Sequence, residues 1–312
     1  MLEEGLRGIY PPVVLPFGAD GTIDHASLEH HIEHLLAAGV HGLWINGTTG
    51  EFHALDADQR LQAVRVAVKA ARGSVPVIAH VGDTSTGLVI GHARSALAAG
   101  ADQVAIVPPY FVDFTQDELR QHVRRVVGEL GVPVLVYHLP QLAKVGLTVD
   151  SIATLAQEGA VVGVKDSSND MVWFRQLLSG ARAAGISLAC FTGGSSMTDV
   201  GLYLGAAGAM SSAANLTPRH LVGMYDAATA GDWVRLRAMQ EEMETLLAAL
   251  RLPRRAGTFS ATAGVHKYVL TVLGHIAGDF AAEPLAPLDE DERRHLASTA
   301  VPIVERLEGR TS

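Results

Sequence analysis

The amino-acid sequence predicts an α/β protein built as a (β/α)8 barrel, or TIM barrel, with a C-terminal helical extension. Short β-branched or apolar runs alternate with longer segments of helical period, which is the pattern of βα units around a parallel sheet. Eight such runs precede residue 216, and no GxGxxG fingerprint of an open doubly wound sheet follows the first of them. The chain of 312 residues is 48% hydrophobic, which suits one large domain with an appendage.

Each of the eight runs is bounded by glycine, proline or polar residues, as expected of buried strands. In chain order the predicted strands are GIYPPVVLPF (8–17), HGLWING (41–47), PVIAHV (76–81), DQVAIVPP (102–109), PVLVYHLP (133–140), VVGVKD (161–166), SLACFTG (187–193) and GAMSSAAN (208–215). The intervening segments are amphipathic. Segments 56–73 and 115–131, for example, open on Asp or Thr as N-cap candidates and close on Gly.

After Asn215 the strand pattern stops and only helical patterns follow. These cover residues 217–231, 232–250, 264–274 and 289–309. The sequence therefore predicts a catalytic barrel domain over residues 1–225 and a helical extension over residues 226–312.

Charge and composition exclude several classes of protein. The formal net charge is -9 and no Lys/Arg run is longer than a pair, so the sequence predicts no nucleic-acid partner and no anionic-membrane partner. The start, MLEEGLRGIY, lacks a basic region followed by an apolar core, and no apolar segment is long enough to span a bilayer. These features predict a cytoplasmic protein. The single cysteine, Cys190, lies in the apolar run SLACF and is expected to be a small buried hydrophobe.

In a barrel of this kind the chemistry lies where the strands run into the following loops. Lys165 ends the sixth strand and shares one strand face with Gly163, which would leave room beneath the lysine. An unpaired ammonium is costly to desolvate, so its pKa falls and the amine becomes neutral and nucleophilic. The alternative is an ion pair with Asp166 or with another carboxylate of the barrel.

The use of lysine in this chain supports the first interpretation. Lys and Arg together number 24, yet lysine occurs only at positions 69, 144, 165 and 267. Where only a cation is needed, arginine is this chain's usual choice. A primary amine can form a Schiff base with a carbonyl substrate, and a guanidinium cannot. Lys69 and Lys267 fall within predicted helices.

Two further strand ends carry candidate groups. Tyr137 ends the fifth strand, on the strand face opposite to that of His138, and its phenol could donate and accept a proton; the alternative is a packed aromatic with a satisfied hydroxyl. The segment NGTTGE places Gly47 and Gly50 around Thr48 and Thr49. Converging amides and two hydroxyls could hold a small carboxylate, although an ordinary turn is equally compatible with the residues.

In combination these motifs resemble the N-acetylneuraminate lyase and dihydrodipicolinate synthase family of Schiff-base class I aldolases. The resemblance rests on VLPF, GTTGE, VIAHVG, VPPYF, VYHLP, GVKDSS and GAMSSAAN, which occur in this order along most of the chain. It implies a barrel with C-terminal helices, a homotetramer or dimer, and no metal or organic cofactor. It also implies that the partners are pyruvate, or another 2-keto acid, and an aldehyde.

The resemblance also implies residue roles. Lys165 would form the imine with the keto carbon, Tyr137 would relay protons, and Thr48 and Thr49 would bind the keto-acid carboxylate. The wider set of candidate substrate-binding residues adds Gly47, Tyr110, Gly193, Ser195, Ser196 and Ser212.

The sequence departs from the family pattern at positions that concern the substrate. Leu142 stands where the synthase branch has an arginine that binds the carboxylate of its second substrate. Phe111 stands where that branch has a second tyrosine. Ser195 and Ser196 stand where neuraminate lyases have an Asp-Glu pair for the sugar hydroxyls. A shorter 2-keto-3-deoxy sugar acid, or another pyruvate adduct, is therefore the expected substrate. Asn169 stands where the family often has glycine.

Three other functions are compatible with parts of the sequence. The 14 histidines suggest a metal-dependent barrel hydrolase, since His30 and His34 are four residues apart on one predicted helix that also carries His31. His80 and His138 end different strands and no third ligand is evident, so a solvated helix surface is the preferred interpretation. A keto-acid-binding sensor would be expected to lack the lysine or the tyrosine. A dehydratase that uses the same imine is the main alternative among enzymes.

Overall fold

The computed structural model describes residues 5–255 and 260–309, and its core is a barrel of eight parallel strands. The strands are β1 Gly8–Ile9, β2 Leu43–Ile45, β3 Val77–His80, β4 Gln103–Ile106, β5 Val134–His138, β6 Val161–Asp166, β7 Ala189–Thr192 and β8 Gly208–Ala209. They pair in the order β1-β8-β7-β6-β5-β4-β3-β2. The two ends of this order meet where Pro12 pairs with Trp44 in parallel, which closes the barrel. The predicted (β/α)8 barrel is confirmed.

The first and the last strand are shorter than predicted. β1 covers only two residues of the predicted run 8–17, because Pro11 and Pro12 have no amide hydrogen to give to a ladder. The chain still follows β2, since the Trp44 amide donates to the Pro11 carbonyl at 3.0 Å and the Val13 amide donates to the Trp44 carbonyl at 2.9 Å. The predicted run 208–215 divides into β8 and a 3-10 turn, Ser212–Asn215.

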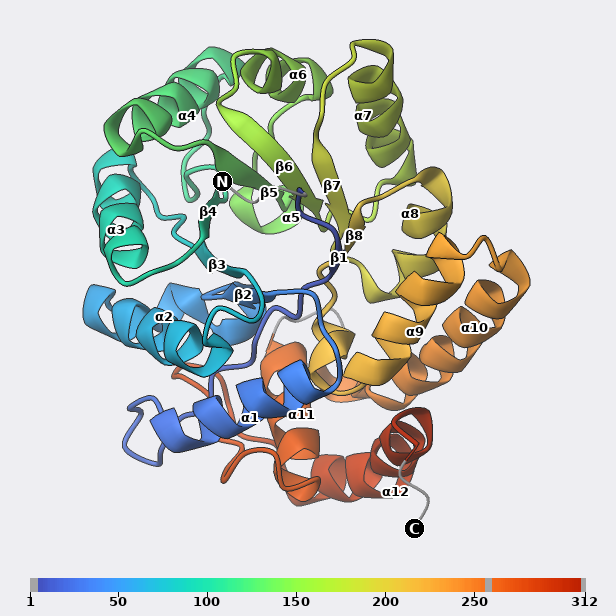
Figure 1. Cartoon of the computed structure of the whole chain (residues 1–312). Helices are drawn as coiled ribbons and strands as arrows, with labels where there is room; N and C mark the ends of the chain where they lie inside the picture. The colour runs from blue at the N-terminus through green and yellow to red at the C-terminus, as the bar shows by residue number, and fades with distance from the viewer. Residues whose placement is uncertain (1–4, 256–259, 310–312) are drawn as a thin grey trace.

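Helices surround the strands, as Figure 1 shows. Those between strands are α1 His25–Ala37, α2 Ala57–Ala71, α3 Thr86–Ala98, α4 Gln116–Leu130, α6 Val149–Gln157, α7 Met171–Ala183 and α8 Thr198–Leu204. Asp56 and Thr115 cap α2 and α4 as predicted, each in a capping box with the residue three positions later. α4 ends at Gly131 in the left-handed conformation, whereas at the end of α2 Arg72 takes that conformation, one residue before the predicted glycine.

The C-terminal part is helical, as predicted, and packs against the start of the barrel. It contains α9 Pro218–Thr229, α10 Trp233–Ala249, α11 Ser260–Val272 and α12 Glu290–Leu307. α11 lies beside α1 (Figure 1), and the Ala277 amide donates to Ser27 Oγ of α1 at 2.9 Å. The predicted boundary after residue 225 falls inside α9, and the division into two parts stays a prediction.

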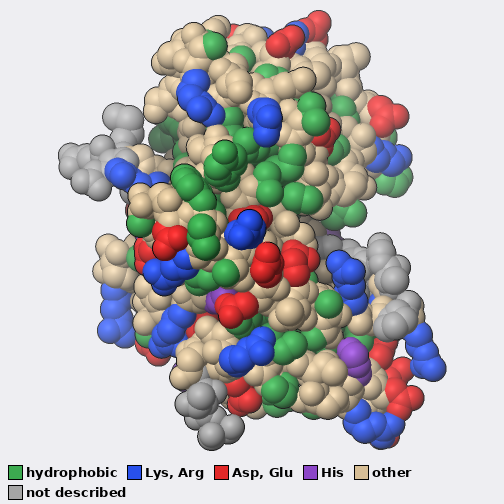
Figure 2. All heavy atoms as spheres, turned by 90° about the vertical axis from the view of Figure 1, so that its right-hand side faces the viewer, with side chains coloured by type: hydrophobic (Ala, Val, Ile, Leu, Met, Phe, Trp, Pro, Cys, Tyr) green, Lys and Arg blue, Asp and Glu red, His purple; other side chains and the backbone are tan. Residues whose placement is uncertain are grey.

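Figure 2 shows the side of the molecule that carries α8 and α10, where apolar side chains gather among charged ones. The exposed apolar residues of these two helices are Val200, Tyr203, Trp233 and Val234. The rings of Tyr203 and Trp233 meet edge to face, 5.3 Å apart. Cys190 is buried and free, as predicted. Among the described residues no helix is long and apolar enough to cross a membrane.

Candidate active site

Lys165 lies inside the barrel, beside Tyr137. In the parallel pairing of β5 with β6, Tyr137 stands opposite Lys165 and Leu135 stands opposite Gly163. The lysine side chain is 3% exposed. Its Nζ lies 4.3 Å from the centroid of the Tyr137 ring and 4.5 Å from that of the Trp44 ring. The register of β5 against β6 therefore brings the amine and the phenol together.

The Lys165 amine has no counter-charge among the described residues. The expected alternative, an ion pair with Asp166, is wrong, because that carboxylate accepts the Ser168 amide at 2.9 Å instead. Desolvation by burial lowers the pKa of Lys165 to about 7. Two aromatic faces can hold the ammonium form, so the amine exchanges between its two forms near neutral pH. A buried amine of this kind is a nucleophile.

Gly163 serves a different purpose from the one expected. A Cβ at this position would lie 2.7 Å from the Ala189 carbonyl oxygen and 3.3 Å from Leu135 Cδ2. The space is therefore already filled, and the glycine allows β6 and β7 to approach closely. Any side chain at this position would push the two strands apart.

Tyr137 is both packed and hydrogen-bonded. Its ring meets those of Trp44 and His80 edge to face, at 5.5 Å and 5.7 Å. Its hydroxyl lies 3.2 Å from Thr48 Oγ1. Burial raises the pKa of Tyr137, although its hydrogen bonds with Thr48 and Ser167 oppose that shift. The phenol is thus neutral and hydrogen-bonded to the Thr48 hydroxyl, which can pass a proton.

The NGTTGE segment forms a buried 3-10 turn, Thr48–Gly50, directly after β2. A Cβ on Gly47 would lie 2.6 Å from Trp44 Nε1, and one on Gly50 would lie 3.0 Å from the Val13 carbonyl oxygen. The amides of Thr48 and Thr49 open the turn and donate to no described residue. These two amide N–H groups are therefore able to donate hydrogen bonds to a carboxylate.

The C-terminal extension holds this turn through a buried ion pair that the sequence did not suggest. Glu51, at φ 57° in the left-handed region, pairs with Lys267 of α11, and both side chains are fully buried. Lys267 Nζ also donates to the Phe280 carbonyl at 2.8 Å, and Glu51 Oε2 accepts the Ala282 amide at 2.7 Å. Desolvation lowers the pKa of Lys267 to about 8, against the effect of Glu51. The loop conformation is thus fixed from outside the barrel.

Two further residues at the site, Trp44 and His80, had no predicted role in it. Trp44 forms part of the wall around the Lys165 amine, and the only sequence signal was its place in the predicted second strand. His80 stacks 6.1 Å from Trp44 and donates from Nδ1 to the Asn46 carbonyl at 2.9 Å. Burial and the neighbouring Arg60 lower the pKa of His80 to about 3, so its ring is neutral.

A pocket of about 240 Å³ opens beside Tyr137. Its lining residues are Thr48, Phe52, His53, Val107, Tyr110, Tyr137, Leu139, Leu142 and Ala143. Of the predicted substrate-binding residues, it brings together Thr48 and Tyr110 with the catalytic candidate Tyr137.

The remaining candidates lie elsewhere. The Gly193 amide donates to the Asp166 carbonyl at 2.6 Å. Ser195 Oγ lies 2.7 Å from Ser211 Oγ, while exposed Ser196 donates to Glu244 of α10 at 3.4 Å. Ser212 begins the 3-10 turn after β8 and is half-buried. None of these four residues lines the pocket beside Tyr137, and neither do Gly47, Thr49 and Lys165.

The histidines of α1 form the expected solvated surface only in part. His31 is buried and donates to Asn215 Oδ1 at 3.0 Å, and His34 stacks on His275 at 3.8 Å. His30 is exposed, 6.4 Å from the same ring. His138 stacks on Trp173 of α7 at 3.8 Å, which confirms that it faces the helices. Within residues 5–255 and 260–309, no three His, Cys, Asp or Glu side chains are grouped to hold a metal ion.

The structure shows the backbone conformation of two residues that depart from the family pattern, Asn169 and Phe111. Asn169 has φ 61°, in the left-handed region that asparagine tolerates and glycine prefers, which explains how it can stand in for a glycine. Phe111 also has a positive φ, 87°, and its side chain is 79% exposed. It does not line the pocket within this chain.

Comparison with known proteins places the chain in a family. Residues 5–302 match the Dihydrodipicolinate synthetase family. The chain belongs to this family. An uncharacterized DapA-like lyase of Halobacterium salinarum is 38% identical over 293 residues, which cover 94% of this chain and 92% of that protein. A 4-hydroxy-tetrahydrodipicolinate synthase of Acidiphilium cryptum is 35% identical over 285 residues, covering 91% and 94%.

A solved structure of the same family carries a ligand. It is a prophage protein of E. coli K12 in complex with pyruvate, with a TM-score of 0.87 and 25% identity, and the match covers 97% of this chain and 99% of that one. The dihydrodipicolinate synthetase family is a family of lyases. The matched range, residues 5–302, contains the barrel strands, Lys165 and Tyr137.

Proposed function

We propose that this member of the dihydrodipicolinate synthetase family is a pyruvate-dependent class I aldolase. It cleaves or forms a pyruvate adduct through a Schiff base on Lys165. The observation that carries the proposal is the buried amine without a counter-charge, whose pKa is lowered to about 7, beside a hydrogen-bonded phenol. The pyruvate complex of the prophage relative supports the choice of keto acid.

The proposed reaction runs through an imine. The neutral Lys165 amine attacks C2 of the 2-keto acid, the Tyr137 phenol gives its proton to the departing oxygen, and loss of water leaves a protonated imine and a Tyr137 phenolate. Tyr137 takes the proton of the C4 hydroxyl; the C3–C4 bond breaks, its electron pair forms the C2–C3 double bond of an enamine, and the aldehyde departs. A proton returned by Tyr137 to C3 restores the imine, and water releases pyruvate and the free amine. The amides and hydroxyls of Thr48 and Thr49 bind the carboxylate throughout.

Enamine formation can be tested without knowing the aldehyde. In deuterium oxide the enzyme should exchange the methyl protons of pyruvate for deuterium, because the enamine is protonated from solvent. Proton NMR measures the loss of the methyl signal. Lys165→Met should abolish the exchange. Exchange that persists in this variant would contradict the role of the amine.

The lowered pKa of Lys165 predicts the pH dependence of the reaction. The attacking form is the neutral amine, so kcat/KM for adduct cleavage should be level above pH 7 and fall about tenfold per pH unit below it. The measurement is a pH profile of pyruvate release between pH 5 and 9, with circular dichroism as a control for unfolding. A profile level down to pH 5 would mean that no group with this pKa takes part.

A dehydratase would share the imine and differ only in the bond that breaks, so product analysis separates the two reactions. Pyruvate with an aldehyde supports cleavage, and a deoxy keto acid with an intact carbon skeleton supports dehydration. A protein that binds the keto acid only as a sensor would give neither product.

The quaternary structure and location are further parts of the proposal. The exposed apolar side chains of α8 and α10 support a homo-oligomer, a tetramer or a dimer, which the molar mass in solution tests. We place the protein in the cytoplasm, as its composition suggests, and fractionation of the cells that make it tests this. The proposed chemistry requires no metal or organic cofactor.

A further inference from the structure

Given the proposed function, the pocket beside Tyr137 is placed to hold the departing half of the substrate. Thr48 and Tyr137, at its inner end, are the groups assigned to the keto acid and to proton transfer, and the two hydroxyls lie 3.2 Å apart. Lys165 Nζ is 4.3 Å from the Tyr137 ring. A group attached beyond C4 of a keto acid on Lys165 therefore extends toward the outer lining of this pocket.

The outer lining is hydrocarbon. Phe52, Val107, Leu139, Leu142 and Ala143 form most of it, and no Asp, Glu, Lys or Arg side chain lines the pocket. Leu142 is 51% exposed, so it stands at the mouth and presents an apolar surface to whatever enters. A leucine there offers no hydrogen bond to a hydroxyl or a carboxylate.

The polar groups of the lining are largely engaged. The Thr48 and Tyr137 hydroxyls lie within hydrogen-bonding distance of each other, and the Tyr110 phenol lies beside the guanidinium of Arg60. His53 is exposed at the pocket; its ring packs edge to face on that of Phe52 at 6.0 Å, and partial desolvation lowers its pKa, so the ring is neutral. A chain of sugar hydroxyls placed here would lose its bonds to water and gain few in return, at a cost of about 1–3 kcal/mol for each unpaired group.

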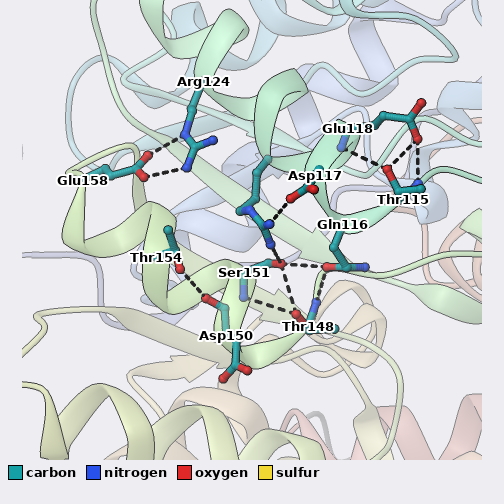
Figure 3. Close-up of polar contacts among 11 residues, drawn as sticks. Thr115, Gln116, Asp117, Glu118, Arg124, Thr148, Asp150, Ser151, Thr154 and Glu158 are labelled. Atoms are coloured by element: carbon teal, nitrogen blue, oxygen red, sulfur yellow. Dashed lines mark hydrogen bonds and ion pairs between the residues drawn. The ribbon is translucent and has the colours of Figure 1, made fainter.

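Hydrogen bonds anchor the part of the apolar wall that follows β5. Leu139, Leu142 and Ala143 lie in or beside the one-turn helix α5, Pro140–Ala143, where Gln141 Nε2 donates to the Ser167 carbonyl at 2.6 Å. Further along the chain, Gln116 of α4 donates to the Gly146 carbonyl at 2.9 Å. Its Oε1 accepts the Thr148 amide at 2.9 Å and the Ser151 hydroxyl at 2.8 Å, as Figure 3 shows for these three residues.

This anchoring makes the wall a preorganised surface and not a flexible loop that adapts to polar ligands. We infer that the aldehyde half of the substrate is an apolar group, an aromatic ring or a branched hydrocarbon, and not a polyhydroxy chain. The inference rests on the proposed function and departs from the sugar acid expected from the sequence.

The test compares two pyruvate adducts that differ only in the aldehyde. One is 4-hydroxy-2-oxo-4-phenylbutanoate, made from benzaldehyde, and the other is 4,5,6-trihydroxy-2-oxohexanoate, made from glyceraldehyde. Pyruvate release gives kcat/KM for each. The phenyl adduct should be cleaved with a kcat/KM at least about tenfold higher, because the pocket binds its ring and leaves hydroxyls unpaired.

Two variants test whether Leu142 causes the preference for the phenyl adduct. Leu142→Asn should reduce the ratio of the two kcat/KM values by about tenfold. Leu88→Asn changes a leucine of similar exposure, 49%, on α3 outside this pocket and should leave the ratio unchanged.

The deuterium exchange of pyruvate separates the possible failures. If exchange occurs and the trihydroxy adduct is preferred, or the phenyl adduct is not cleaved, the apolar assignment is overturned and the lysine chemistry stands. If exchange does not occur, the proposed function fails and this inference fails with it.

Discussion

Replacing Lys165 with arginine should reduce kcat for adduct cleavage by a factor on the order of 10³ or more. Arginine keeps the positive charge and much of the length of the side chain, but its guanidinium stays protonated and cannot form an imine. The effect is therefore on chemistry and not on charge balance. The measurement is pyruvate release under saturating substrate, with Lys165→Met as a second variant.

The matched control for this prediction is Lys69→Arg. Lys69 is an exposed lysine of α2 that pairs with Glu29 at 3.0 Å. Arginine can replace it in that pair, so activity should be unchanged. Full activity in Lys165→Arg would show that the amine is not the nucleophile, and the proposed reaction type would be wrong.

Replacing Lys267 with methionine should lower the free energy of unfolding by about 3–5 kcal/mol. Lys267 and Glu51 are both fully buried, so the substitution leaves the Glu51 carboxylate without its counter-charge in a dry environment. Among the described residues, its other hydrogen-bond donor is the Ala282 amide. Because Glu51 ends the turn that carries Thr48 and Thr49, we also expect KM for pyruvate adducts to rise. Urea denaturation at a fixed protein concentration measures the first effect, and steady-state kinetics measure the second.

The double variant Glu51→Gln with Lys267→Met should recover part of the lost stability, since a neutral amide can accept the Ala282 amide hydrogen without a counter-charge. Lys69→Met breaks an exposed ion pair and should cost about 0–1 kcal/mol. Equal losses in Lys69→Met and Lys267→Met would contradict the assignment of the buried pair.

The barrel could be predicted from sequence because its pattern is local. Each apolar run and each N-cap is a matter of neighbouring residues, and the run VVGVKD was predicted with the bounds it has in the structure, Val161–Asp166. The ends of β1 were not predictable in the same way, because Pro11 and Pro12 sit in an apolar run yet cannot donate to the ladder. Closure of the barrel there depends on Trp44, more than thirty residues later in the chain.

Within the site, the sequence predicted which side chains of one strand share a face. Parity separated Tyr137 from His138, whereas the observed pairing of β5 with β6 is what places Lys165 opposite Tyr137. Contacts between distant segments were not predictable. The scarcity of lysine raised the question of Lys165, but the same scarcity applied to Lys267. Its place in a predicted helix did not reveal that its side chain is fully buried. Its partner Glu51 was visible only as the end of a loop motif. The contact of His34 with His275 was hidden for the same reason.

Reductive trapping tests the central claim most directly. The enzyme is incubated with pyruvate and sodium borohydride, digested, and examined by peptide mass spectrometry. We expect loss of activity and a reduced pyruvate adduct on the peptide that contains Lys165, with the peptides of Lys69, Lys144 and Lys267 unmodified. An unmodified Lys165 peptide from enzyme that turns over normally would contradict the account.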